Sequence, residues 1–120
     1  MRICLLNAPP GYAATLGQLP PVKELTRLGK PHTLDFIQFF AMSAILLAAN
    51  FAKLSRALAY DGMLWISWAK QAAKVDTDLN ETIVRQLGLV AGLVDVKVAA
   101  IDETWSGLKF VYRVEDRPGR

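Results

Sequence analysis

The amino-acid sequence predicts a three-layer α/β fold with a mostly parallel sheet that is closed by an antiparallel hairpin. Short apolar runs that suit buried strands alternate with segments that suit helices. Such alternation favours right-handed crossovers between parallel strands. The last two runs, Val94–Ile101 and Leu108–Val114, alternate apolar and polar residues on either side of a glycine-containing turn. This pattern is typical of a hairpin.

The first part of the chain supplies strands separated by proline-rich and glycine-rich breaks. Arg2–Asn7 is continuously apolar around its centre and predicts a buried strand, which Ala8–Gly11 must end. Tyr12–Leu19 is compatible with a short helix, and Val22–Leu28 suits either a short strand or a helical turn. Thr33–Phe40 is rich in aromatic and branched residues and predicts another strand.

A long apolar helix is expected over Ala44–Ala59, with Ser43 as its N-cap. Its polar residues form only a narrow stripe of Asn50, Lys53 and Arg56, next to Ser43. A helix that is apolar nearly all round must bury more than one face. We therefore expect either a further element or a second subunit to cover it. In the second case the chain forms a homo-oligomer through residues 44–59.

The second half of the chain continues the alternation of strands and helices. Tyr60–Gly62 is expected to be a turn, and Met63–Trp68 a strand that is apolar on both faces. Asp78 and Glu81 have the spacing of a capping box, with Asp78 as the N-cap of a helix. Gly92 suits the position just after that helix.

The order of these elements predicts one Rossmann-like domain over residues 1–120, with a frayed tail at residues 115–120. Five or six strands are expected in the order 2-1-3-4-6-5, where the short run near residue 22 is strand 2. In the hairpin, Asp95 is expected to share a face with Lys97, Lys109 and Arg113 and to be their charge partner.

Composition excludes several classes of protein. The chain has 120 residues, of which 52% are hydrophobic, so it can build one core and disorder is not expected. The longest apolar run, residues 39–49, is too short to cross a bilayer, and no signal peptide is evident. The single cysteine, Cys4, fits a reducing compartment. We therefore expect a cytoplasmic protein.

The net charge of +3 is unevenly distributed. Residues 1–60 hold six Lys or Arg against two Asp or Glu, and residues 61–120 hold eight against nine. A basic first half could attract phosphates, which leaves weak nucleic-acid binding as one alternative. A nucleic-acid footprint would need a stronger basic surplus, so the composition argues against such a partner.

The arrangement over residues 33–114 resembles the carboxyl half of class I methyltransferases. In those enzymes a glycine turn leads into the fifth strand, and an antiparallel strand is inserted beside it. The runs Asp61–Trp68, Gly92–Val98 and Asp102–Phe110 are similar to a family of small bacterial proteins classed as a domain of unknown function. That family often has Pro-Lys after the tryptophan-bearing strand, where this chain has Ala69 and Lys70. The resemblance implies architecture and no established activity.

The loop after the first strand decides the prediction about cofactors. A Rossmann cofactor site needs several glycines there, because the backbone must approach a phosphate closely. This chain has Asn7-Ala8-Pro9-Pro10-Gly11-Tyr12, with one glycine and two prolines. The loop is also similar to the Asn-Pro-Pro-Tyr motif of amino-group methyltransferases, but its spacing and its strand differ. We therefore expect no cofactor, no intact S-adenosylmethionine site and no catalytic activity.

The residues that could still bind a ligand lie where open α/β sheets bind them, at the carboxyl ends of the strands. Asn7, Gly11 and Tyr12 follow the first strand, and Trp68 and Lys70 end the tryptophan-bearing strand. Together they could form an aromatic and basic pocket for a nucleotide or a small anion, although core packing also explains the aromatic residues. No metal site is expected, because His32 is the only histidine and has no ligand-spaced partner.

Three functions follow, in order of preference. The first is a non-catalytic interaction module, dimeric through the apolar helix. The second is a degenerate domain that binds a nucleotide or an S-adenosylmethionine-like molecule. The third is a weak nucleic-acid binder.

Overall fold

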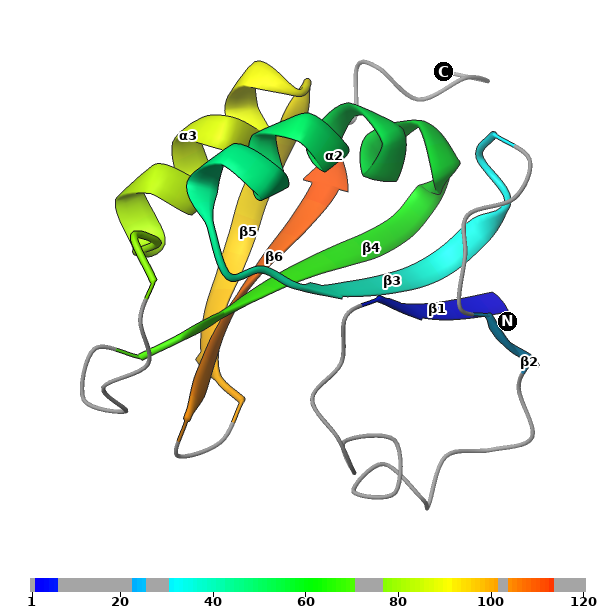
Figure 1. Ribbon diagram of the computed structural model, residues 1–120. Helices are drawn as coiled ribbons and strands as arrows, with labels where there is room; N and C mark the ends of the chain where they lie inside the picture. The colour runs from blue at the N-terminus through cyan, green and yellow to red at the C-terminus, as the bar shows by residue number, and fades with distance from the viewer. Residues whose placement is uncertain (1, 7–22, 26–30, 71–76, 102–103, 114–120) are drawn as a thin grey trace.

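The computed structural model describes residues 2–6, 23–25, 31–70, 77–101 and 104–113. These residues form one six-stranded sheet and two helices (Figure 1). In chain order they are β1 (Arg2–Leu6), β2 (Lys23–Leu25), β3 (Leu34–Phe40), α2 (Ala44–Ala57), β4 (Leu58–Ala69), α3 (Glu81–Val90), β5 (Leu93–Ala100) and β6 (Trp105–Tyr112). The expected helix over residues 12–19 and the expected tail at 115–120 lie outside the described residues.

The sheet is mixed, and its strands follow the order β2-β1-β3-β4-β6-β5, the same order that the sequence predicts. The pairs β1–β2, β1–β3 and β3–β4 are parallel. The pairs β4–β6 and β5–β6 are antiparallel. Among the four strands whose side chains are described, from β3 to β5, only one of the three pairings is therefore parallel.

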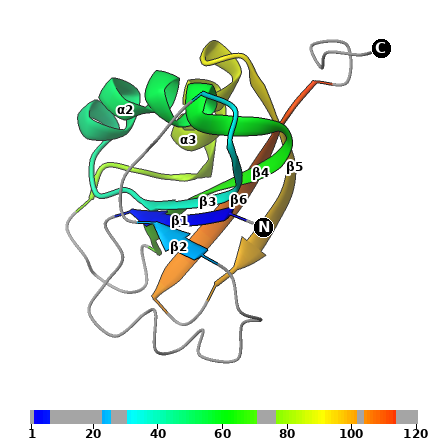
Figure 2. The ribbon, with the colours of Figure 1, turned by 90° about the vertical axis from the view of Figure 1, so that its right-hand side faces the viewer.

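The prediction of a three-layer, mostly parallel Rossmann-like sheet is therefore wrong for the described molecule, although the fold is still α/β. The closing hairpin places β6 between β4 and β5, which makes this side of the sheet antiparallel. Both helices lie side by side on one face (Figures 1 and 2). The connections β3-α2-β4 and β4-α3-β5 step in the same direction across the sheet. Right-handed crossovers that step in the same direction place their helices on the same face. The described part thus has two layers.

The core lies between this helical layer and the sheet. It contains large, fully buried side chains from every described element of that region: Ile37, Leu47, Leu54, Leu64, Ile66, Val84, Leu93, Leu108 and Phe110. Phe51 of α2 meets Phe110 of β6 edge to face, with 5.4 Å between ring centroids. Burial of each such side chain stabilises the fold by about 1.5–3 kcal/mol.

The helix termini correct one detail of the sequence interpretation. Ser43 caps α2 as expected, because its side chain accepts a hydrogen bond from the Leu46 N–H. The N-cap of α3 is Asn80 and not Asp78. The Asp78 carboxylate instead accepts from the Ala44 N–H, 2.9 Å away, at the start of the other helix. Helix α3 therefore begins two residues later than its capping-box pattern indicates.

The expected turn at Tyr60–Gly62 is also wrong, because these residues belong to β4. The register between β3 and β4 shifts there. Between the paired residues Leu34–Leu58 and Phe36–Met63, β4 has more residues than β3. A Cβ on Gly62 would lie 2.8 Å from the Asp35 carbonyl oxygen. Glycine is therefore required for close backbone contact at a strand irregularity and not for a reversal of the chain.

The end of α3 and the hairpin confirm the sequence interpretation. Gly92 has a φ of +94°, a conformation that glycine adopts without strain. The antiparallel pairing of β5 with β6 confirms the hairpin, although β6 begins at Trp105, earlier than the expected Leu108. No helix of the described residues is long and apolar enough to cross a membrane.

Candidate functional site

Hydrogen bonds to backbone carbonyl groups hold the carboxyl edge of β3 and β4. The Ala41 N–H donates to the Ser67 carbonyl over 2.8 Å, and the Lys70 N–H donates to the Thr104 carbonyl over 2.8 Å. The Thr77 hydroxyl donates to the Met42 carbonyl, also over 2.8 Å. These contacts join the ends of two strands to the segments before α3 and β6, near Trp68 and Lys70.

The structure places two of the five predicted site residues at this edge. Trp68 is only 5% exposed and belongs to the core cluster beneath the helices, so packing accounts for its ring. Lys70 is half-buried just after β4. Asn7, Gly11 and Tyr12 lie outside the described residues. A pocket that unites all five residues therefore stays a prediction.

A buried polar pair and an aromatic pair lie beside this edge, on the face of the sheet that the helices do not cover. The Gln38 side-chain amide donates to the Ser67 hydroxyl over 3.2 Å, and both residues are buried. Phe40 meets Trp105 edge to face, with ring centroids 5.1 Å apart. Within the described part of the chain, no buried side-chain polar atom lacks a hydrogen-bond partner, as is usual in protein cores.

A cluster at the opposite end of the sheet was not foreseen from the sequence. His32 stacks on Tyr60 with ring centroids 4.1 Å apart, and Tyr112 lies beside both rings. The three residues come from the segment before β3, from β4 and from β6. Because 28 and 80 residues separate His32 from its two partners, no local pattern in the sequence indicates this contact.

Hydrogen bonds fix the orientation of this cluster. His32 Nδ1 lies 3.0 Å from the Leu58 carbonyl oxygen, which can only accept, so Nδ1 carries the proton. Nε2 lies 3.0 Å from the Tyr60 hydroxyl oxygen, within hydrogen-bond distance. The Tyr112 hydroxyl donates to the Ser55 carbonyl near the end of α2. Burial raises the pKa of Tyr112 above its ordinary value. The cluster thus ties the end of α2 to two strands.

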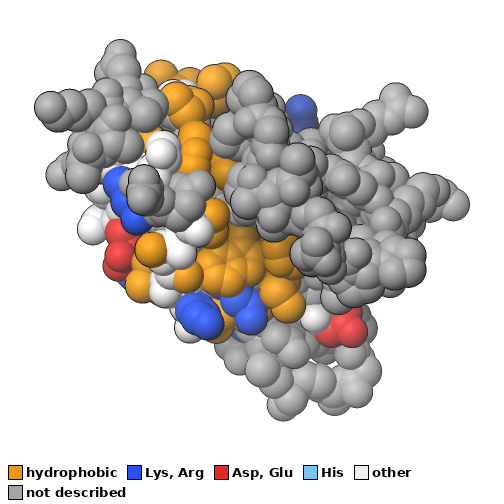
Figure 3. Space-filling view, turned by 90° about the horizontal axis from the view of Figure 1, so that it is seen from below, with side chains coloured by type: hydrophobic (Ala, Val, Ile, Leu, Met, Phe, Trp, Pro, Cys, Tyr) orange, Lys and Arg blue, Asp and Glu red, His pale blue; other side chains and the backbone are white. Residues whose placement is uncertain are grey.

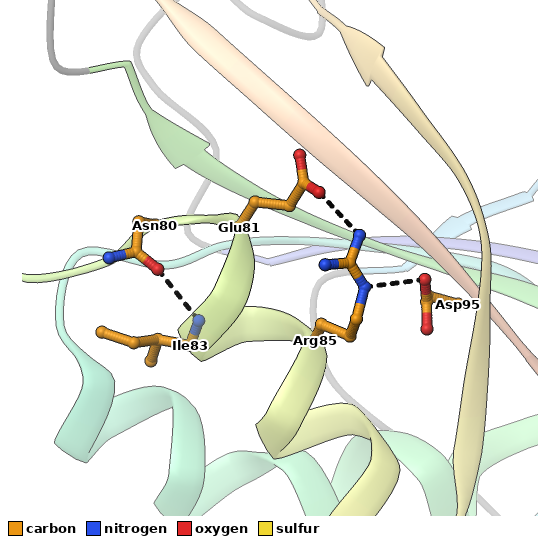
Figure 4. Close-up of polar contacts among 5 residues, drawn as sticks. All are labelled: Asn80, Glu81, Ile83, Arg85 and Asp95. Atoms are coloured by element: carbon orange, nitrogen blue, oxygen red, sulfur yellow. Dashed lines mark hydrogen bonds and ion pairs between the residues drawn. The ribbon is translucent and has the colours of Figure 1, made fainter.

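The charges on α3 and β5 form one network (Figure 4). Arg85 donates from Nη2 to Glu81 at 2.6 Å and from Nε to Asp95 at 2.9 Å. Hydrogen bonds to Asp95 and then to Glu81 raise the pKa of Arg85 above its ordinary value. Asp95 therefore pairs with Arg85 on the helical side of the sheet. The expectation that Asp95 is the partner of Lys97 and Lys109 is wrong.

The outward surface of α2 is apolar and open to solvent. Ile45 is 80% exposed and Leu46 is 59% exposed, and Met42 just before the helix is 43% exposed. Between them and Lys53 lie the exposed alanines Ala48, Ala49 and Ala52, and the partly exposed Asn50 donates to the Leu46 carbonyl. Only one face of this helix is buried, by Leu47, Phe51, Leu54 and Ala57. The helix therefore leaves its second apolar face uncovered by the described residues.

No group of three or more His, Cys, Asp or Glu side chains in the described part of the chain could hold a metal ion. His32, the only histidine, is engaged with Leu58 and Tyr60.

Comparison with known proteins identifies the fold. No protein-family model and no curated protein matches the sequence. The mitomycin 7-O-methyltransferase MmcR is 10% identical with a TM-score of 0.73, and the match covers 93% of this chain and 49% of that one. An S-adenosylmethionine-dependent methyltransferase from Aquifex aeolicus is 16% identical with a TM-score of 0.59, over 92% and 81% of the two chains.

A TehB-like S-adenosylmethionine-dependent methyltransferase from Corynebacterium glutamicum is 12% identical with a TM-score of 0.58, over 93% of this chain and 80% of that chain. At such identities the likeness concerns the fold alone. It agrees with the sequence-based resemblance to class I methyltransferases. The chain therefore has a truncated, methyltransferase-like α/β fold.

Proposed function

We propose that this chain is a non-catalytic interaction module that forms a homodimer through the outward face of α2. The observation that carries this proposal is the exposure of Ile45 and Leu46 on a helix whose opposite face already fills the core. Isolated exposed apolar residues are ordinary, but a contiguous apolar surface on a stable helix is typical of an interface. The absence of an intact glycine-rich loop in the sequence supports a role without catalysis.

A second copy of the chain fits this face for a physical reason. A twofold axis brings the same patch of both copies together, so an apolar surface that is nearly free of charge is complementary to itself. The small alanines at the centre, Ala48, Ala49 and Ala52, allow two helices to approach closely. Lys53 and Arg56 lie toward the other end of the helix and would form the polar rim.

The size of the face sets the expected affinity. A 14-residue helix is about 21 Å long. One helix pair of that length buries less than the roughly 800 Å² per partner of a standard interface. We therefore expect a weak dimer, with a dissociation constant in the micromolar range.

Sedimentation velocity over a range of protein concentrations tests this proposal. The parent chain should shift from monomer to dimer at micromolar concentration, and Ile45→Glu should remain monomeric. Val90→Lys is the matched control, because Val90 is 86% exposed on α3. Glutamate is favoured near the N-terminus of a helix, where Ile45 lies, and lysine near the C-terminus, where Val90 lies. Both variants should therefore fold. A parent chain that is monomeric throughout, or equal loss of dimer in both variants, would contradict the proposal.

A second function is supported by the likeness to S-adenosylmethionine-dependent methyltransferases and by the position of β1 between β2 and β3. In open α/β sheets, ligands bind where the strand order reverses in this way. On this reading Asn7, Gly11, Tyr12 and Lys70 would bind a nucleotide-like molecule or a small anion. Trp68 would support the site from within the core and not by direct contact.

Thermal unfolding with S-adenosylmethionine, S-adenosylhomocysteine and adenine nucleotides tests this second function. A ligand present at about 100 times its dissociation constant stabilises a protein by about 2.7 kcal/mol. For a domain of this size, that raises the midpoint by several degrees. Lys70→Gln should reduce the shift, whereas Lys53→Gln on α2 should not. Unchanged midpoints at millimolar ligand would exclude this function.

A further inference from the structure

A row of polar and aromatic residues crosses the sheet on the face that the helices do not cover. Strand pairing aligns Gln38 of β3 with Trp65 of β4, and Trp65 with Lys109 of β6. Lys109 is in turn aligned with Lys97 of β5. Residues that pair directly across strands point to the same face. Because the neighbours Ile66 and Leu108 are in the core under the helices, this row faces away from them.

The exposed part of this row consists of Trp65 and the two lysines that follow it across the sheet. Gln38 is buried against Ser67, whereas Trp65 and Lys109 are partly exposed and Lys97 is exposed. A Cβ on Gly107 would lie 3.0 Å from Trp65 Cε3, so the ring lies directly over the backbone of β6. Figure 3 shows hydrophobic side chains gathered on this face, with Lys or Arg side chains beside them.

The two lysines lie directly opposite each other, which is unfavourable without a counter-charge. Within the described residues, the ion pairs involve Arg85, Glu81 and Asp95, on the other side of the sheet. The register shift between Asp95 and Lys97 causes this separation, because it turns Lys97 to the face opposite Asp95. An anion bound between Lys97 and Lys109 would relieve their repulsion.

We propose that Trp65, Lys97 and Lys109 form a binding face for single-stranded nucleic acid, with a base stacked on the indole and a phosphate between the two lysines. Aromatic side chains on an open sheet provide stacking surfaces for unpaired bases, and adjacent cations follow the phosphate backbone. The row runs across neighbouring β-strands, so an extended single strand of nucleic acid can lie along it. The site lies on the opposite face from α2 and is independent of the proposed dimer.

This site differs from the basic surface that the sequence indicates. The charge distribution along the chain points to the first half, whereas Lys97 and Lys109 lie in the second half, whose net charge is negative. Strand pairing, and not the overall charge, brings them together next to Trp65. The expectation from composition that nucleic acid is not a partner therefore does not take this face into account.

Fluorescence anisotropy with a labelled oligodeoxythymidine of roughly 15 nucleotides tests the site. The parent chain should bind at low salt, and binding should weaken between about 50 and 200 mM salt. The double variant Lys97→Gln, Lys109→Gln should reduce the slope of log K against log salt by about 0.7, because the one phosphate between the two lysines contributes about that much on a single strand. Lys53→Gln with Arg56→Gln removes two charges from the helical side and should leave the slope unchanged.

The role of stacking is tested separately at Trp65. Trp65→Leu should weaken binding by about tenfold, and Trp65→Phe should restore most of it, because phenylalanine keeps an aromatic face. Circular dichroism of each variant separates loss of binding from loss of fold. Three outcomes would overturn the proposal: no binding at low salt, equal effects of the two double variants, or equally tight binding of polyglutamate, which has no bases to stack.

Discussion

Gly88 shows how a single residue sets the packing of α3 on the sheet. A Cβ at this position would lie 2.0 Å from Phe110 Cε1, within the buried core. In an exposed helix, glycine to alanine gains about 1 kcal/mol of helix propensity. Here the overlap with a buried ring dominates, so Gly88→Ala should lower the free energy of unfolding by about 1–3 kcal/mol. Urea denaturation measures this loss.

Thr82→Ala is the matched control for that variant, because Thr82 is exposed on the same helix. It should leave the free energy of unfolding unchanged or raise it by a few tenths of a kcal/mol. If Gly88→Ala proved as stable as this control, the conclusion that Gly88 is required for the close packing of α3 on Phe110 would be wrong.

Tyr112 should make the stability of the fold depend on alkaline pH. Burial raises the pKa of its phenol above the ordinary value of 10.0. The folded state therefore holds this proton more tightly than the unfolded state does. The stabilisation is complete below the unfolded pKa and is lost as pH rises through the folded pKa. Urea denaturation from pH 8 to 11 should show this decline starting near pH 10.

Tyr112→Phe removes both the titrating group and its hydrogen bond to the Ser55 carbonyl. This variant should be less stable than the parent at pH 8, by about 1 kcal/mol for the lost hydrogen bond. Its stability should then fall less steeply above pH 10. Parallel pH profiles for the two proteins would show that Tyr112 is not the responsible group.

At the scale of elements, the two helix N-termini are joined through Asp78. Its carboxylate caps the Ala44 N–H of α2, while Asn80 caps α3 through the Ile83 N–H. Asp78→Ala and Asn80→Ala should each lower the free energy of unfolding by about 1 kcal/mol. Asp61→Ala, at an exposed position of β4, should have little effect. Chemical denaturation of the three variants tests these capping roles. An Asp78→Ala variant as stable as Asp61→Ala would argue against the cap formed by Asp78.

The elements that could be predicted are those fixed by local interactions. Ser43 and Gly92 mark a helix start and a helix end because cap geometry involves only a few neighbouring residues. The hairpin follows from period-two alternation. The prediction of a turn at Gly62 was wrong because glycine also allows close backbone contact between strands. That contact depends on β3, which is not adjacent in the sequence.

At the scale of the whole molecule, the two proposed surfaces lie on opposite faces of the sheet. Distant sites that share no partners act independently, usually to within about 0.5 kcal/mol. Ile45→Glu should therefore leave the affinity for oligodeoxythymidine within about twofold of the parent value. Anisotropy at protein concentrations below those of dimerisation tests this. A larger loss would mean that dimer formation and nucleic-acid binding are coupled.

The sequence by itself determined the α/β class, the strand order, the closing hairpin and the likeness to the methyltransferase fold. The class and the hairpin follow from hydrophobic periods and local turn chemistry, which each segment carries alone. The strand order and the likeness rest on the resemblance to class I methyltransferases. Only the tertiary structure decided that both described helices share one face, that Asp95 pairs with Arg85, and that Trp65, Lys109 and Lys97 form one row. Such contacts depend on crossover direction and strand register, which arise only when distant segments pack together.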